Sequence, residues 1–439
     1  MFFHINTNIR NIGLSCSVIF LLSNSVMAED CLVPLKENTV RSEVKLSKSS
    51  RKACIEQASL FFEQPNLTAD ELYTGDLKNR GFLPNQQLYC RFTFHKKSGS
   101  SPKFRCFLTD PYYNYYSKDR NIADSAIATD SQGYLLNSYG HQIYNESSGK
   151  AVKADKVRIK YTTGKPRHRE VFTEIAASRI FWALGIYHDS MYPVQVKCLG
   201  CSENPHKESQ KYAVEDIQNF FPTSVERKLP GKEIELKNNQ GWSKNELEKK
   251  YQSSSESAKI EIEAFVLATN LFNYHNPLWF QNRIMCLDGY YDKITGVCNK
   301  SVMYIHDLGS TFGSDGLFVN PRGDYSKWRD KGIFRDRASC KVRGNFGDIK
   351  YISEEARSFL MLRLNALTEE KVRAIFAAAH FELVDEELST EVSLQNPNMI
   401  GPELDLLIIN NWVSTFIDRI EEIASLRCPN LEQSVRENQ

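Results

Sequence analysis

The stretch KVRIKYTTGKPRHREVFTEIAASRIFWALG, residues 156–185, decides the fold class of this chain of 439 residues. Its first six residues alternate between polar and apolar, with Val157 and Ile159 on one face, and this period of two predicts a β-strand. After a polar turn, apolar residues recur at helical spacing and stop at Gly185, a residue type that commonly ends helices. A strand followed by such a helix predicts a mixed α+β fold.

Similar patterns run along the rest of the chain, which is too long for one compact core. We expect strands at 88–96, 103–109, 191–198, around a Pro-Gly turn in 224–236, and from 301 to Asp307. We expect helices at 53–63, 258–273, 353–367, 368–381 and 402–426, and a capped turn or short helix at 66–73. Residues 111–150 have little periodicity and read as a loop, and the polar stretch 237–257 marks a change of unit.

These elements divide the chain into five segments. The predicted segments are a leader (1–28), an N-terminal extension with strands and a mobile insertion (29–155), a mixed unit (156–236), a mainly helical unit (237–390) and a helical tail (391–439). The chain has 55 Lys and Arg against 54 acidic residues, so no global field attracts nucleic acid. We therefore expect no nucleic-acid partner, while a protein or small-molecule partner stays open.

Residues 1–28 have the pattern of an export signal. They hold one charged residue, Arg10, then a short apolar run, then Val26 and Ala28 at the positions where signal peptidases require small residues. We predict cleavage after Ala28 and a periplasmic or secreted protein. The apolar run is too short to span a membrane, and no later segment is apolar enough, so we expect no integral membrane segment in the mature chain.

Ten cysteines follow the leader, and an even number in an exported chain predicts disulfides. Local pairs are the simplest expectation, and they are Cys90 with Cys106 and Cys286 with Cys298. Cys198 and Cys201, three residues apart, fit a redox pair, half a zinc site or two structural thiols. We favour the structural role and expect no zinc.

Four features occur in an order that phosphoryl transfer uses. They are a strand lysine (Lys160), a helix glutamate fourteen residues later (Glu174), a polar loop after a buried helix (residues 273–283) and an aspartate ending a buried strand (Asp307). Such a lysine holds nucleotide phosphates and is fixed by the helix carboxylate, while such an aspartate holds a metal ion. Glu170 competes with Glu174 for the helix role, and we favour Glu174 because small residues around it permit close approach.

Several motifs together also resemble a known group. VRIKY, REVFTEIAASRIFWALG, VERKLPGKEIE, GWSKNEL, IHDLGSTFG and ISEEARSFLMLRL are similar to those of a largely uncharacterised family of bacterial exported proteins. That family is distantly similar to the atypical protein-kinase-like fold of HipA-type and secretory-pathway kinases. The resemblance covers residues 65–382 except 111–155. It implies a two-lobed fold, with a small lobe of mixed sheet and helix, a larger mainly helical lobe and an N-terminal extension.

The resemblance also implies roles for individual residues. Lys160 matches the phosphate-binding lysine, Glu174 its partner and Asp307 the metal-binding aspartate, which implies ATP with Mg²⁺ or Mn²⁺ as the cofactor. Residues 225–228 match the hinge that faces an adenine ring. A glycine-rich loop of the G-x-x-x-x-G-K-[ST] type is absent from the sequence.

The loop NYHNPLWFQNR, residues 273–283, departs from the family pattern. The position of the catalytic aspartate falls on Asn276, which can hydrogen-bond a hydroxyl but cannot accept its proton. The second metal-ligand position falls on Gln281, with Asn282 beside it. No Asp or Glu lies in the loop, and His275 is the candidate replacement base.

Three functions therefore compete. The first is an exported kinase-like protein, either a pseudokinase or an atypical nucleotide-dependent transferase. The second is a non-enzymatic envelope or secreted binding protein that uses the fold as a scaffold. The third, a thiol-disulfide enzyme using Cys198 and Cys201, is least favoured because that pair does not lie at a strand-to-helix junction.

Overall fold

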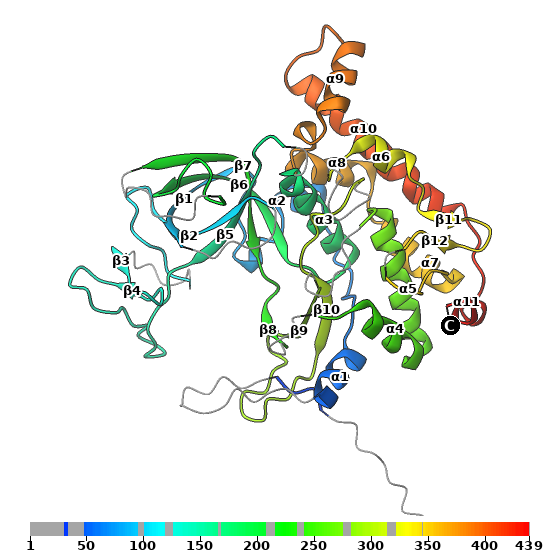
Figure 1. Ribbon diagram of the computed structural model, residues 1–439, viewed down its shortest axis with the longest axis horizontal. Coiled ribbons are helices and arrows are strands. Elements are labelled where there is room, and N and C mark those ends of the chain that lie inside the picture. The colour runs from blue at the N-terminus through cyan, green and yellow to red at the C-terminus, as the bar shows by residue number, and fades with distance from the viewer. Residues whose placement is uncertain are drawn as a thin grey trace, which may run out of the picture.

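The computed structural model confirms a mixed α+β fold (Figure 1). A barrel of strands lies on one side of the molecule, most of the helices lie on the other, and helix α3 lies between them. The structure describes residues 30–33, 48–94, 101–118, 126–165, 168–207, 216–234, 241–274, 282–313, 322–344 and 346–438. Among these residues, no helix combines the length and the apolar character that a membrane crossing requires.

The barrel is closed, with strand order β1-β2-β5-β7-β6. Its strands are β1 (Gln86–Thr93), β2 (Lys103–Thr109), β5 (Lys156–Tyr161), β6 (Ser190–Leu199) and β7 (Ile217–Arg227). β1 and β6 pair in parallel and the other neighbours pair antiparallel. Closure leaves no free edge, and the interior is filled by side chains such as Phe104, Ile159, Val194 and Val225. The barrel joins strands from both 29–155 and 156–236, and the domain boundaries stay a prediction.

Helix α3 (Glu170–Leu184) is buried on almost every face. Gly185 ends it in the left-handed conformation, with φ of 69°, as its place in the sequence predicts. The small residues Ala176 and Ala177 let the helix pack closely against strands β6 and β7 and helices α7 and α8. Any charged side chain on this helix must therefore find its partner inside the protein.

A second sheet has the order β10-β9-β8, with β8 (Gly231–Glu233), β9 (Asn282–Leu287) and β10 (Ser301–Ile305). Every residue of β10 is buried, as predicted. The turn that carries Asp307 therefore follows directly after a strand that is held in the core. The buried helix expected at 258–273 is α5 (Glu256–Leu271). The polar stretch before it is not a simple boundary, because a capping box between Ser243 and Glu246 starts helix α4 (Lys244–Ser253).

Trp328, Trp412 and Phe416 form a cluster of stacked and tilted aromatic rings among the remaining helices. These helices are α1 (Lys48–Gln57), α2 (Ala69–Thr74), η1 (Leu77–Asn79), α6 (Tyr325–Asp330), α7 (Glu354–Leu364), α8 (Glu369–Ala378), η4 (Phe381–Leu383), α9 (Glu386–Gln395), α10 (Pro402–Ala424) and α11 (Leu431–Glu437). Two further strand pairs are β3 (Ala128–Thr129) with β4 (Leu135–Leu136), and β11 (Phe334–Asp336) with β12 (Lys341–Val342). The helices expected in the last third of the chain are thereby confirmed.

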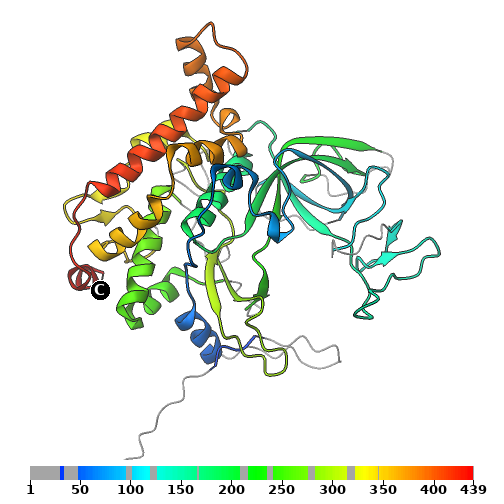
Figure 2. The same cartoon turned by 180° about the vertical axis from the view of Figure 1, so that it is seen from behind.

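Two expectations from the sequence were wrong in part. The helix expected at 53–63 ends at Gln57, and the chain then runs extended, with Phe61 bridging to Ile186 beyond the end of α3 (Figure 2). The segment 111–150 is not a featureless loop where the structure describes it. It forms the β3–β4 hairpin around a small core that includes Leu135 and Val152. There the Asp130 and Asn137 side chains accept hydrogen bonds from backbone N–H groups, and these bonds order the turns in place of apolar periodicity.

Five disulfides join the ten cysteines that lie within the described residues. They are Cys31–Cys54, Cys90–Cys106, Cys198–Cys201, Cys286–Cys298 and Cys340–Cys428. The two local pairs predicted from the sequence are confirmed. Cys198 and Cys201 are bonded to each other, a state that a redox pair and a structural disulfide share, so the structural role stays a prediction.

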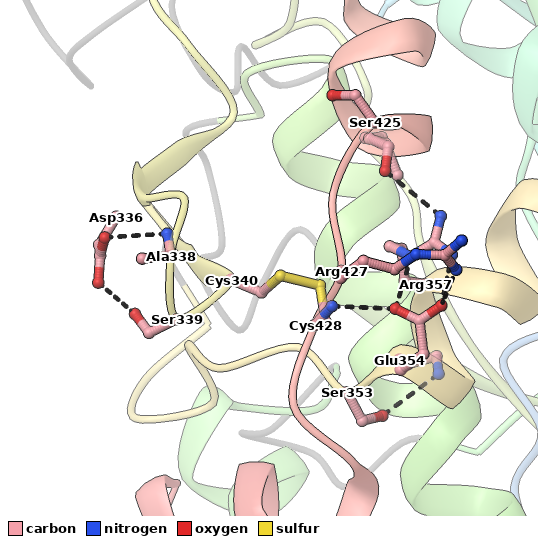
Figure 3. Close-up of a disulfide and its surroundings, with 12 residues drawn as sticks. Asp336, Ala338, Ser339, Cys340, Ser353, Glu354, Arg357, Ser425, Arg427 and Cys428 are labelled. Carbon is pink, nitrogen blue, oxygen red and sulfur yellow. Dashed lines mark hydrogen bonds and ion pairs between the residues drawn. A yellow bond between two sulfur atoms is a disulfide. The ribbon is translucent and has the colours of Figure 1, made fainter.

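The Cys340–Cys428 disulfide closes the longest of these loops and ties the start of β12 to the segment after α10 (Figure 3). Beside it, Glu354 accepts a hydrogen bond of 2.9 Å from the backbone N–H of Cys428 and pairs with Arg357. The hydrogen bonds from Arg357 and from Cys428 lower the pKa of Glu354 to about 2. This carboxylate therefore stays charged over the physiological range and holds the two chain segments together.

We predict that the double substitution C340S/C428S lowers the free energy of unfolding by about 4.6 kcal/mol, the loop-closure entropy of an 88-residue loop. The matched control is C198S/C201S, whose three-residue separation predicts a loss of only about 1.6 kcal/mol. Urea unfolding followed by circular dichroism measures both. Equal losses in the two variants would show that loop length does not set the contribution.

Candidate functional site

Lys160 is the centre of the candidate site. Its neighbours Ile159 and Tyr161 point into the barrel, so the Lys160 side chain leaves the barrel on the side that α3 covers. It is only 4% exposed. Its Nζ lies 2.6 Å from Glu174 Oε1, 3.0 Å from Glu170 Oε1 and 3.9 Å from Asp307 Oδ1. The three features predicted from strand, helix and strand end thus meet at one ammonium group.

Glu170 and Glu174 both bind Lys160, although the sequence favoured only Glu174. They are four residues apart on α3, which places both carboxylates on the same helix face. Glu170 has two further partners, the Ser101 hydroxyl, which donates a hydrogen bond to it, and the Arg322 guanidinium. Arg322 also donates a hydrogen bond of 3.2 Å to Ser101 Oγ.

The turn after β10 is fixed against the start of α3. The backbone N–H of Gly309 donates to Asp307 Oδ1 at 3.2 Å, and Thr173 donates to the Gly309 carbonyl at 2.9 Å. The Glu170 side chain passes directly over Gly309, and a Cβ added there would lie 2.0 Å from Glu170 Cγ. A glycine is therefore required at this position by the close approach of Glu170.

The charges of the site shift one another's pKa. Burial and the charge of Asp307 together raise the pKa of Glu174 to about 8, against the opposing effect of the nearby Lys160. Burial also acts to raise the pKa of Asp307, but Lys160, Lys103 and His306 together lower it below its ordinary value. For Lys160, burial favours the neutral form, but Glu174 and Asp307 outweigh it and raise the pKa. At neutral pH Lys160 and Asp307 are charged, and the raised pKa leaves Glu174 mostly protonated.

A second charged network lies next to the first. Arg158, two residues before Lys160 on β5, pairs with Glu226 at 2.7 Å, and its NH1 lies 3.5 Å from His306 Nε2. His306 in turn binds Asp189 through Nδ1. His306 therefore points into a different network from Asp307. Glu226 lies in the predicted hinge 225–228 at the end of β7, and the hinge role stays a prediction.

Most of the predicted catalytic loop lies outside the described residues, including His275, Asn276 and Gln281. Asn282 is described, as the first residue of β9, and is fully buried opposite Ile305. Its amide nitrogen donates a hydrogen bond of 2.8 Å to the Trp242 carbonyl. Its side-chain oxygen, Oδ1, has no hydrogen-bond partner in the described part of the chain. A metal-ligand role for Asn282 stays a prediction.

Two groups of side chains in the described residues have the spacing that a metal ion needs. One consists of Glu170, Glu174 and Asp307, and the other of Asp189, Glu226 and His306, each with ligand atoms within 4.8 Å of one another. The first group offers only carboxylate oxygens, which Mg²⁺ and Mn²⁺ prefer. Its Glu174 Oε2 is buried without a hydrogen-bond partner among the described residues. A carboxyl group with a raised pKa beside the Asp307 carboxylate fits a site that takes a cation in place of a proton.

The sequence did not reveal Ser101, Lys103 and Arg322 as part of the site. Ser101 lies in the connection between β1 and β2, shortly before β2 begins, and Lys103 is the first residue of β2. The sequence predicted both of those strands, but no local signal showed that β2 pairs with β5, the strand of Lys160. Arg322 is distant in sequence from every other member of the site, and no motif marks it.

Comparisons with known proteins add little to this geometry. No protein-family model matches the chain, and no curated protein matches it significantly. One solved structure that is similar is a proinflammatory kinase, CtkA, of Helicobacter pylori. The identity is 11%, the TM-score is 0.36, and the match covers 77% of this chain and 97% of that one. This likeness is too low to establish a shared fold or function, and membership of the exported bacterial family stays a prediction.

We predict that G309A destabilises the protein by about 1–3 kcal/mol, because the new methyl group overlaps the Glu170 side chain. The matched control is G332A, where the nearest atom to an added Cβ is 3.5 Å away, and it should change the free energy by less than about 0.5 kcal/mol. Chemical denaturation of both variants measures the difference. A G309A variant as stable as the control would show that Glu170 is not held over the turn.

Proposed function

We propose that this protein binds ATP together with Mg²⁺ or Mn²⁺ in a two-lobed, protein-kinase-like fold. The observation that carries the proposal is the position of Lys160 Nζ, 2.6 Å from Glu174 on a helix and 3.9 Å from Asp307 after a buried strand. In phosphoryl-transfer proteins a strand lysine of this kind holds the nucleotide phosphates, its helix carboxylate orients it, and the aspartate holds the metal ion.

The arrangement of elements supports the proposal. In the proposed two-lobed fold, the barrel and α3 form the smaller lobe, and α5, α7, α8 and α10 form the larger one (Figure 1). β7 leads from the barrel to the second sheet, so residues 225–228 are the link between the proposed lobes. Lys160 comes from the smaller lobe and Asp307 from the second sheet, and the proposed nucleotide lies where the two meet.

The residues present fit a hard divalent cation. Asp307 and Glu174 offer carboxylate oxygens, and Glu174 Oε2 lacks a partner among the described residues. A bound Mg²⁺ or Mn²⁺ supplies positive charge that offsets the charge of the phosphates. Lys160 provides a fixed, dry cation for the same phosphates, and burial strengthens its electrostatic effect because water does not screen it. We assign Asp307 as the principal metal ligand and Glu174 as the group that orients Lys160.

The chemistry of the bound nucleotide depends on the loop that holds Asn276. An amide at this position orients a hydroxyl but does not accept its proton, and general-base catalysis typically contributes about 10²–10⁴-fold. Nucleotide binding does not require that base. We therefore propose a pseudokinase or an atypical nucleotide-dependent transferase, with His275 as the candidate base and Gln281 and Asn282 as candidate second metal ligands.

We also propose that the protein is exported. Disulfides form and persist in oxidising compartments, and five of them join ten cysteines in this chain. The signal sequence inferred from residues 1–28 lies outside the described residues. Little ATP is found outside the cell, which favours the rival function, a non-enzymatic binding protein. The burial and pairing of Lys160 also suit that rival, because they suit a purely structural ion cluster.

The first test is thermal stabilisation of the mature protein by millimolar ATP with Mg²⁺ or Mn²⁺. We expect the melting temperature to rise, because a ligand at 100 times its Kd stabilises by about 2.7 kcal/mol. D307N and K160M should abolish the rise. The matched control is K156M, on the same face of the same strand but exposed, which should retain it. No stabilisation of the unmodified protein by either metal complex would favour the scaffold function.

The second test restores the missing carboxylate. We expect N276D to increase transfer of the γ-phosphate from labelled ATP by about 10²-fold or more while leaving the affinity for ATP nearly unchanged. Parallel reactions with α-labelled ATP identify nucleotidyl transfer, which would place the protein among atypical transferases. A variant that binds ATP but transfers neither label faster than the parent protein would contradict the role given to Asn276.

A further inference from the structure

Lys103 is a cation at the site that the roles above leave unassigned. In the pairing of β2 with β5 it lies directly opposite Lys160. Its neighbour Phe104 points into the barrel, so the Lys103 side chain leaves the barrel on the same face as Lys160. Residues opposite one another in a sheet have Cβ atoms about 4.5–5.5 Å apart, and like charges in such a pair destabilise it.

The other cations around the site each have a carboxylate partner. Lys160 binds Glu174, Arg322 binds Glu170 and Arg158 binds Glu226. The Lys103 side chain forms no ion pair or hydrogen bond within the described part of the chain, although the residue is half-buried. A partly buried ammonium without a counter-ion is costly, and its cost here is increased by the charge of Lys160 opposite.

The electrostatics of Lys103 agree with this geometry. Burial and repulsion by Lys160 together lower its pKa to about 8, while Asp307 and Glu174 act in the opposite direction. Lys103 is therefore close enough to the proposed metal ligands to sense their charge but forms no direct bond with them. It lies beside the place where the proposed phosphates bind.

We propose that Lys103 is a second phosphate-binding lysine, which supplies with Lys160 a pair of cations for the polyphosphate of the bound nucleotide. This inference rests on the proposed function for the identity of the nucleotide, but the anion site itself does not. A polyphosphate carries several negative charges along its length and can bridge two lysines that repel one another in its absence. The unfavourable pair is thus the structural signature of a site built for an anion.

A lysine with this role has a signature that a structural lysine lacks. K103M removes the repulsion between Lys103 and Lys160, so the free protein should become equally or more stable. The same substitution removes a charge-assisted contact to phosphate, so the affinity for a polyphosphate should fall by about tenfold or more. A lysine that only supports the fold would give a loss of stability and no selective loss of affinity.

The experiment measures the binding of inorganic tripolyphosphate and of ATP with Mg²⁺ by titration calorimetry, together with the melting temperature of each free protein. The variants are K103M, K103R, which keeps the charge, and K156M as the control on β5. We expect K103M to lose about tenfold or more in affinity for tripolyphosphate, K103R to keep most of it, and K156M to match the unmodified protein.

The outcomes separate this inference from the proposed function. Equal affinity of K103M and the unmodified protein for tripolyphosphate would overturn the role of Lys103, even where ATP binds. Binding of tripolyphosphate that depends on Lys103, without binding of ATP, would support the anion site and overturn the nucleotide. An unmodified protein that binds neither ligand would overturn both.

Discussion

The burial of the Lys160 ammonium among carboxylates is the constraint on which the rest of the site depends. Removing a charge from water costs several kcal/mol, and the cost is recovered only when partners are held in good geometry. Glu174 and Glu170 provide that geometry because both come from one face of α3. Any displacement of α3 relative to β5 would leave both the ammonium and the carboxylates unpaired. The barrel and α3 are therefore fixed to one another by electrostatics as well as by packing.

This constraint extends to the turn that carries Asp307. Because Glu170 must reach Lys160, it passes over Gly309, and the chain there leaves no room for a side chain. Thr173, the residue before Glu174 on α3, donates a hydrogen bond to the carbonyl of the same glycine. The aspartate is thus positioned by contacts with the helix that positions the lysine. Strand, helix and turn form one unit, in which a change at any member alters the distance from Lys160 to Asp307.

The sequence predicted the parts of the site that depend on local patterns. Alternation placed Lys160 on a strand, helical spacing placed Glu174 on a helix, and an apolar run placed Asp307 at a strand end. The sequence favoured Glu174 over Glu170, but both carboxyl groups bind Lys160. The sequence could not show this, because it depends on how deeply α3 is buried. It did not identify Lys103, Ser101 or Arg322, since pairing of β2 with β5 and parallel pairing of β1 with β6 are long-range properties.

Two unsatisfied groups in the site complement one another. Glu174 has a buried oxygen without a donor in the described part of the chain, and Lys103 has an ammonium without an acceptor there. They sense one another's charge, yet the fold does not bring them into contact. A purely structural ion cluster would be expected to join them, because each would remove the cost of the other. A metal–polyphosphate complex satisfies both at once, since its cation suits the carboxylates and its anion suits the lysines. In the proposed function, the separation of the Glu174 oxygen from the Lys103 ammonium distinguishes a ligand site from a salt bridge that only stabilises the fold.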